Sequence, residues 1–184
     1  FLLVMFCITG GGNLAKAQDL KSVTLDFEGS GIFPYNDDWT ISNFIVYSSW
    51  NHTTSGSNSA STNKKESAVA QYKNKLENIS KVVYYISKTT TNTNTSSYFL
   101  VETSTDGSNW VGQGLSPTFD KITQGEWTEV TVTLATPVTG YVRVSYKGST
   151  AVRVVDDITV YYTPAPVGTT DPEISYSTSS LTIA

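Results

Sequence analysis

Acidic residues interrupt two strongly apolar segments, one near each end of the chain. Asp26 and Glu28 stand in the early segment, and Asp156 and Asp157 stand in the last one. A carboxylate inside a β-sheet core is costly unless it is paired, hydrogen-bonded or bound to a metal. If the first and last strands lie side by side, Asp26 or Glu28 reaches the same place as Asp156. Several carboxylate oxygens around one point suit a hard cation, so the pattern predicts a structural calcium site.

The last apolar run also predicts which way its carboxylates point. Side chains alternate between the two faces of a strand, so Asp156 is expected to share a face with Val154, Ile158 and Val160. A second interpretation needs no metal. In it Asp156 accepts hydrogen bonds from backbone amides at a strand bend, and Asp157 faces water.

The segments that must position these residues have the composition of β-strands. From Lys21 onward, short runs rich in Val, Ile, Tyr, Thr and Phe alternate with clusters of Gly, Asn, Ser and Thr. This predicts an all-β fold, a two-sheet antiparallel β-sandwich (jelly roll) of about eight strands. The expected strands are 22–27, 39–47, 67–72, 79–87, 98–104, 127–134, 141–147 and 151–162. Residues 52–65 and 89–97 are expected to form long exposed loops.

The ends of the sequence predict that the sandwich belongs to a longer exported chain. A short apolar stretch followed by small residues indicates that residues 1–17 are a secretory signal peptide, truncated at its start. Residues 18–163 are the expected jelly-roll domain, and the prolines of 164–172 indicate a linker. Residues 173–184 are expected to begin a further immunoglobulin-like module. We therefore expect a monomeric module of a protein that is secreted or on the bacterial cell surface.

Composition excludes several partners and chemistries. The sequence pI of about 4.9 and the formal net charge of −4 argue against nucleic acid, which requires a basic surface. No second apolar segment reaches membrane-spanning length, so direct membrane insertion is not expected. Cys7 lies in the predicted signal peptide, so the mature chain has no cysteine for disulfides or a thiol nucleophile. With a single histidine as well, zinc and iron are disfavoured.

A hairpin motif carries a first resemblance to known folds. The segment Ser104–Trp110 contains the pattern Ser-x-Asp-Gly-x-x-Trp, and its Asp-Gly step tolerates the positive φ of a tight turn. The motif resembles a hairpin of discoidin-like and related jelly-roll modules. The resemblance implies that it is structural, a turn with Trp110 packed back onto the sheet.

A broader resemblance rests on the acidic segments of both ends. The strings 26–28 and 155–158, with Trp39 after the first, resemble MAM-like and choice-of-anchor jelly rolls of secreted Bacteroidetes proteins, over about residues 20–163. Galactose-binding-like domains and carbohydrate-binding modules share a related ending. The resemblance implies neighbouring first and last strands, and a structural calcium held by Glu28 or Asp26 with Asp156, and with Asp157 as a further ligand. The chain lacks the cysteines of true MAM domains, which favours the bacterial relatives.

Aromatic residues at the end of one strand are the candidate ligand-binding site. Tyr47 and Trp50 run into a polar loop that begins with Asn51 and His52. A flat ring beside Asn and Thr side chains suits stacking on a sugar, whereas the alternative is a half-buried aromatic that closes the sandwich. Weaker candidates of the same kind are Tyr35, Tyr72, Tyr85 and Trp110.

Groups suited to catalysis are few. His52 is the only imidazole, and it has no evident nucleophile or orienting partner in the sequence. A glycosidase needs two carboxylates that flank one bond. The available ones lie in turns or at strand ends and are interpreted as surface charges: Asp37, Asp38, Glu102, Asp120, Glu126 and Glu129.

These features together predict a non-catalytic binding or adhesion module, with carbohydrate as the favoured ligand class and calcium as a structural ion. The ligand class rests on the resemblance and the rim aromatics, because such folds serve many functions. One alternative is a structural spacer or protein-interaction domain attached to a catalytic module. A second is a glycan-cleaving enzyme on the same sandwich.

Overall fold

The computed structural model describes residues 19–28, 37–48, 50–52, 56–62, 67–91, 96–148 and 153–165. Apart from one short 3₁₀-helix, η1 (Phe119–Lys121), the regular structure of these residues is β, which confirms the all-β prediction. The strands are β1 (Lys21–Leu25), β2 (Trp39–Ser42), β3 (Ile45–Tyr47), β4 (Ser59–Ser61), β5 (Val69–Tyr72), β6 (Leu76–Lys88), β7 (Tyr98–Ser104), β8 (Val111–Leu115), β9 (Thr128–Lys147) and β10 (Arg153–Tyr162).

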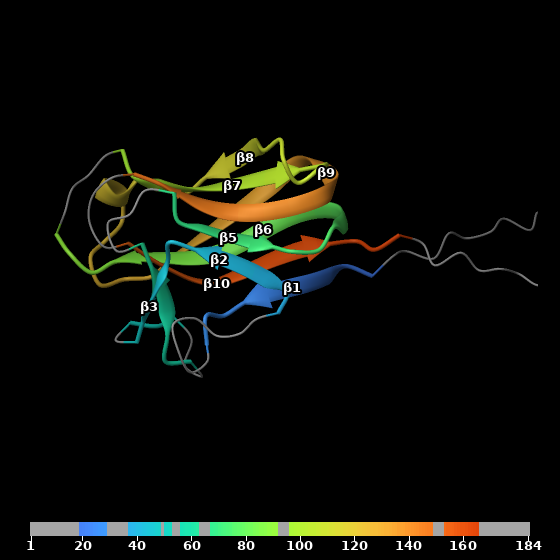
Figure 1. The fold of residues 1–184 in the computed structure, drawn as a ribbon. Coiled ribbons are helices and arrows are strands. Elements are labelled where there is room, and N and C mark those ends of the chain that lie inside the picture. The colour runs from blue at the N-terminus through green and yellow to red at the C-terminus, as the bar shows by residue number, and fades with distance from the viewer. Residues whose placement is uncertain are drawn as a thin grey trace, which may run out of the picture.

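The strands form a two-layer antiparallel sandwich whose layers share β9. The first half of β9 pairs with β6, which pairs with β10, and β10 pairs in turn with β1 and β4. The second half of β9 pairs with β5 and β7. At the edges of this layer, β2 pairs with β5 and β8 pairs with β7. Figure 1 shows β9 curling at one end of the molecule, so that one strand serves both layers. The predicted β-sandwich is confirmed.

The first and last strands are neighbours, as the acidic segments predicted. β1 and β10 pair antiparallel from Lys21 opposite Tyr162 to Leu25 opposite Ile158. They lie side by side in Figure 1. This pairing brings the residues that follow β1 close to the middle of β10.

A bulge in β10 corrects the predicted orientation of Asp156. The register between β10 and β6 shifts between Asp156 and Thr159, and Asp157 has a φ of +49°. The extra residue lets both Val155 and Ile158 reach the core, although they are three positions apart. Asp156 pairs instead with Tyr85 and lies on the outer side of the sheet. The prediction that Asp156 shares a face with Ile158 and Val160 is therefore wrong. The extra residue of the bulge reverses which side chains of β10 point to the core after Asp156.

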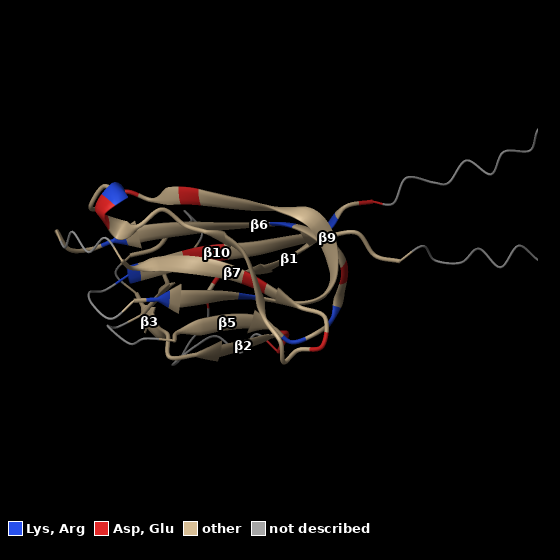
Figure 2. Ribbon diagram, turned by 90° about the horizontal axis from the view of Figure 1, so that it is seen from above, with Lys and Arg blue, Asp and Glu red and all other residues tan. Residues whose placement is uncertain are grey.

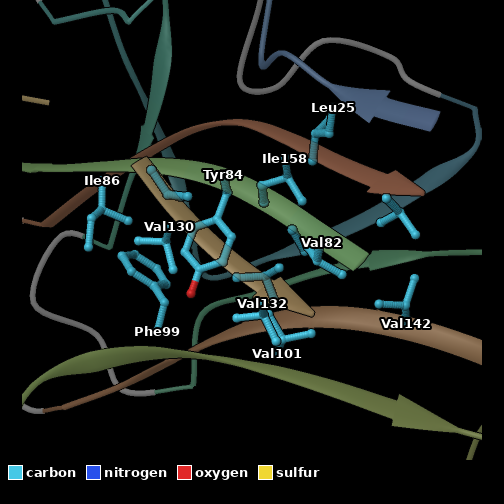
Figure 3. Packing of buried hydrophobic residues seen from close by; sticks show 14 of the residues in the cluster. Leu25, Val82, Tyr84, Ile86, Phe99, Val101, Val130, Val132, Val142 and Ile158 are labelled. Atoms are coloured by element: carbon cyan, nitrogen blue, oxygen red, sulfur yellow. The ribbon is translucent and has the colours of Figure 1, made fainter. Parts of the chain in front are cut away.

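The core lies between the layers and includes aromatic rings from both. Phe99 of β7 is fully buried, and its ring packs near those of Tyr84, Phe119 and Tyr146 at centroid distances of 5.5–6.3 Å. Figure 3 shows valines and isoleucines of both layers around Tyr84 and Phe99. Each such buried side chain stabilises the fold by about 1.5–3 kcal/mol. The core thus fixes the two layers against each other.

The hairpin motif between β7 and β8 folds as predicted. One Asp106 oxygen accepts hydrogen bonds from the backbone N–H groups of Ser108 and Asn109, both at 2.8 Å, and Gly107 has a φ of +78°. These bonds lower the pKa of Asp106 below its ordinary value. Trp110 packs back onto the sheet, with its ring 4.0 Å from the guanidinium carbon of Arg143.

The strand boundaries differ from the prediction in four places. β4 lies inside the polar stretch expected to be a loop, and β8 follows the hairpin where no strand was expected. The expected strand 39–47 is divided into β2 and β3 at Asn43, which has a φ of +58°. The expected strands 127–134 and 141–147 are joined in β9. Sequence alternation did not show these differences because pairing decides them.

Several predictions concern parts of the chain outside the described residues. These are the signal peptide 1–17, the further module 173–184 and, apart from Pro164 and Ala165, the linker 164–172. In the described part of the chain, no helix is long and apolar enough to cross a membrane.

Candidate functional site

The pairing of β1 with β10 gathers the predicted carboxylates. Asp156 is fully buried, and its pKa is raised to about 7. Burial is the main cause, and the negative charges of Asp157 and Glu28 raise the pKa further. Hydrogen bonds from the backbone N–H groups of His52 and Asp157 oppose the rise. Carboxylates from both ends of the sequence therefore influence one another directly.

These carboxylates bind backbone amides of the segment between β3 and β4. Asp156 accepts hydrogen bonds from the N–H groups of His52 and Asp157, each at 2.9 Å. Glu28 accepts hydrogen bonds from the N–H groups of Ser57 and Asn58, also at 2.9 Å. The alternative in which Asp156 caps amides is thus present in the structure. The two carboxylates anchor this segment to the β1–β10 pair.

The described side chains alone do not complete a metal centre. Among the described residues, no group of three or more His, Cys, Asp or Glu side chains could hold a metal ion. The exposed Asp26 accepts a hydrogen bond from the N–H of Glu28 at 3.2 Å. Calcium takes about 6–8 oxygen ligands, and residues 29–36, which follow Glu28 in the chain, lie outside the described residues. The negative charges of Asp157 and Glu28 close to Asp156 favour a cation at this place. The described residues do not provide a complete set of calcium ligands.

His52 lies at the centre of an aromatic cluster on the outer side of β6. Its Nδ1 is 2.7 Å from Oδ2 of Asp157, and its ring stacks on Tyr85 with 3.5 Å between centroids and 13° between planes. The ring of Trp127 meets His52 edge-on, with centroids 5.6 Å apart. We call His52, Tyr85 and Trp127 the aromatic cluster. Because Asp157 contacts His52, the expectation that Asp157 simply faces water is wrong.

Hydrogen bonds fix the orientation of the cluster. The Tyr85 hydroxyl donates to Glu129 at 2.9 Å, which is the main reason that the pKa of Tyr85 is raised. The indole N–H of Trp127 donates to the backbone carbonyl of Asn51 at 3.0 Å. With Asp157 holding His52, each ring of the cluster has a polar partner that restricts its rotation. The cluster is therefore ordered before any ligand arrives.

Of the predicted ligand-binding residues, His52 belongs to this cluster and Asn51 contacts it. Trp50 is half-buried, and its indole N–H donates to Ser87 at 3.2 Å. Trp50 lies two positions before His52 in the chain. Asn51 contacts Trp127 through its carbonyl and donates from its side chain to Gly56. Tyr47 is half-buried at the end of β3, opposite Ser59.

Sequence reasoning missed two members of the site. Trp127 was not singled out, and Glu129 was interpreted as a surface charge, while Tyr85 was only a weaker candidate. The alternation of β6 indicates that Tyr85 points outward, away from the buried Tyr84 and Ile86. Its position opposite Glu129 depends on the register of β6 and β9, which the sequence does not show.

Glu102 and Glu129, two of the acidic residues considered for catalysis, have separate structural roles, and Glu102 is buried and so is not the surface charge that the sequence suggested. Glu102 accepts two hydrogen bonds from Arg143, at 2.8 and 3.1 Å, and one from Ser145 at 2.6 Å. Burial raises the pKa of Glu102, but these bonds and the charges of Arg143 and Lys147 leave it below its ordinary value. Figure 2 shows Asp and Glu at separate positions along the sandwich. In the described residues, Glu102 lies on β7 and Glu129 on β9, each with its own partner.

Comparisons with known proteins show the fold. No protein-family model and no curated protein matches the chain. A cleaved adhesin domain of Lys-gingipain has a TM-score of 0.58 at 19% identity, covering 76% of this chain and 99% of that domain. A second such domain, from Porphyromonas gingivalis, has a TM-score of 0.55 at 16% identity, covering 78% and 99%. A family 22 xylan-binding domain from Paenibacillus barcinonensis has a TM-score of 0.52 at 13% identity, covering 82% and 99%. The chain shares the β-sandwich of these domains.

Proposed function

We propose that this chain is a non-catalytic carbohydrate-binding module that uses the aromatic cluster and the residues around it. The observation that carries the proposal is the ordered arrangement of His52, Tyr85 and Trp127 beside the carboxylates of Asp157 and Glu129. Rings supply apolar surface for the C–H face of a sugar, and carboxylates accept hydrogen bonds from its hydroxyl groups. Both the rings and the carboxylates lie close together on the outer side of β6.

The hydrogen bonds within the site favour binding because they reduce the entropy that a ligand would have to remove. The Tyr85 hydroxyl and the His52 ring are held by Glu129 and Asp157. Side chains that are already ordered lose little rotamer freedom on binding, which otherwise costs about 0.5–1.5 kcal/mol for each one. His52 remains partly accessible, with 27% of its side chain exposed.

The comparisons support the proposal at the level of the fold. One similar structure is named as a xylan-binding domain, and others are named as adhesin domains. Related folds host many functions, so this support is an analogy. The choice of carbohydrate over other ligands rests on the chemistry of the aromatic cluster.

We include calcium and export in the proposal as expectations from the sequence. A calcium ion near Asp156 would offset the repulsion that Asp157 and Glu28 exert on its carboxylate. It would join the end of β1 to the middle of β10 and so stabilise the segment that carries His52. A protein secreted or held on the bacterial surface would meet both calcium and polysaccharide outside the cell.

A glycan array with the full chain tests the proposed function. We expect binding to a defined group of plant, host or microbial glycans, and loss of that signal in Trp127→Ala. Trp110→Ala is the matched control, because Trp110 is also half-buried but packs on Arg143 of the other layer. Circular dichroism checks that both variants fold. A blank array for the folded wild-type protein would favour the spacer or protein-interaction alternative.

A further inference from the structure

Arg153 at the start of β10 is a buried cation whose polar atoms are unpaired. Its side chain is fully buried, and among the described residues Nε, Nη1 and Nη2 have no hydrogen-bond partner. The guanidinium carbon lies 4.2 Å from the centroid of the Phe119 ring, which covers one flat side of the group. The edge that carries the N–H donors is the part left to contact an acceptor.

A second cation, Lys88, pairs with Arg153, and two further residues are linked through backbone hydrogen bonds, Thr62 to Arg153 and Ser97 to Phe119. Lys88 pairs with Arg153 across β6 and β10, is almost fully buried, and donates from Nζ to the Phe119 carbonyl at 2.7 Å. Thr62 donates its backbone N–H to the Arg153 carbonyl at 3.0 Å, and the Ser97 carbonyl accepts the N–H of Phe119 at 3.3 Å. The hydroxyl oxygens of Thr62 and Ser97 are also buried, with no hydrogen-bond partner in the described part of the chain. We call Arg153, Lys88, Thr62 and Ser97 the Arg153 cluster.

The charge of this cluster is not balanced by acidic side chains of the described residues. The ion pairs found there involve other groups, and neither Arg153 nor Lys88 takes part in one. Burial lowers the pKa of Arg153 from its ordinary value, but a guanidinium stays protonated in proteins. Arg143, the other arginine of the sequence, shows the usual solution, because Glu102 accepts two of its hydrogen bonds. A buried charge with unmade hydrogen bonds is among the most costly features of a fold.

We propose that the Arg153 cluster is a binding site for a small carboxylate anion. The planar fork of a guanidinium matches the two oxygens of a carboxylate, and a single negative charge balances the fully buried Arg153. A dianion such as sulfate costs much more to desolvate than a carboxylate when it enters an enclosed place. Hydroxyl donors from Thr62 and Ser97 complete the set of hydrogen bonds. This site is independent of the aromatic cluster and of the proposed carbohydrate binding.

Thermal unfolding of the full chain in sodium acetate tests the site, with sodium chloride and sodium sulfate at equal ionic strength as references. We expect acetate to raise the melting temperature by about 5–10 °C at about one hundred times its dissociation constant. Arg153→Met should lose the acetate response. Arg143→Met is the matched control and should keep it, although its own stability falls. Isothermal titration of the wild-type protein with acetate measures binding directly, whether or not Arg153→Met folds.

Three results would overturn the proposal. The first is a wild-type protein that neither gains stability in acetate nor releases or absorbs heat with it. The second is an equal response to chloride or sulfate, which would indicate a general salt effect. The third concerns Glu66, which lies outside the described residues. If Glu66→Gln responds to acetate while the wild-type protein does not, the chain supplies its own carboxylate and binds no free anion.

Discussion

Replacement of Asp156 by asparagine should change the stability of the metal-free protein in opposite directions at low and high pH. The folded pKa of Asp156 is about 7, well above the ordinary value of 3.8. The folded state therefore holds its proton more tightly than the unfolded state does. The stabilisation that this gives is complete below the unfolded pKa, and it is lost as the pH rises through the folded value. In chelator, wild-type stability should fall between about pH 4 and pH 7.

The size of the effect follows from the raised pKa of Asp156. A rise from 3.8 to about 7, at about 1.36 kcal/mol for each pH unit, gives an upper limit of about 4 kcal/mol. An asparagine at this position cannot ionise, but its amide nitrogen would face one of the two N–H groups that the carboxylate accepts, at a cost of about 1–3 kcal/mol. Asp156→Asn should thus be less stable than the wild-type protein by about 1–3 kcal/mol below about pH 4, before Asp156 begins to titrate in the unfolded state. Near pH 8 it should be more stable by a similar amount.

Urea unfolding of both proteins in chelator, across this pH range, measures the difference. Subtracting one protein's curve from the other's removes the titration of groups that are common to both. A variant that is less stable by the same amount at every pH would refute the reasoning. It would show that Asp156 is ionised at the same pH in the folded and unfolded states.

Three further predictions test other parts of the account. If calcium binds the wild-type protein, a concentration about one hundred times the dissociation constant should add about 2.7 kcal/mol of stability, and an unchanged melt in chelator, with no metal by elemental analysis, would contradict this. Glu102→Gln should lower the free energy of unfolding by about 1–3 kcal/mol at neutral pH, because Arg143 loses its carboxylate partner. The stabilities of the two proteins should converge in acid, because the lowered pKa of Glu102 gives a stabilisation that is lost as the pH falls. Gly140→Ala should destabilise the fold by about 1–3 kcal/mol, because its Cβ would lie 2.1 Å from a backbone oxygen, whereas Gly112→Ala, which meets a flexible leucine at 3.3 Å, is the milder control in chemical denaturation.

The sequence predicted the fold class and one long-range contact. Alternating apolar runs and turn residues indicated the sandwich, and the carboxylates at both ends indicated that the first and last strands pair. The orientation of Asp156 was not predictable, because a strand pattern assumes strict alternation and the bulge at Asp157 breaks it. Nothing in the pair of adjacent aspartates distinguishes a bulge from a regular strand.

The candidate site was predicted only in part. Trp50, Asn51 and His52 were recognised because they follow one another in the chain. Tyr85 and Trp127 join them through the pairing of distant strands, and such registers depend on packing across the whole sheet. Arg153 raised no expectation, because an arginine within an apolar run is interpreted as a surface residue until its burial is seen.

The most direct test of carbohydrate binding is an isothermal titration of a glycan selected on the array, with the wild-type chain and two variants. Loss of a central aromatic contact at a binding site commonly costs about 2 kcal/mol or more, so Trp127→Ala should bind at least about tenfold more weakly. Trp110→Ala, on the other layer, should bind as the wild-type protein does. Equal affinity of the wild-type protein and a folded Trp127→Ala variant would contradict the assignment of the aromatic cluster as the binding site.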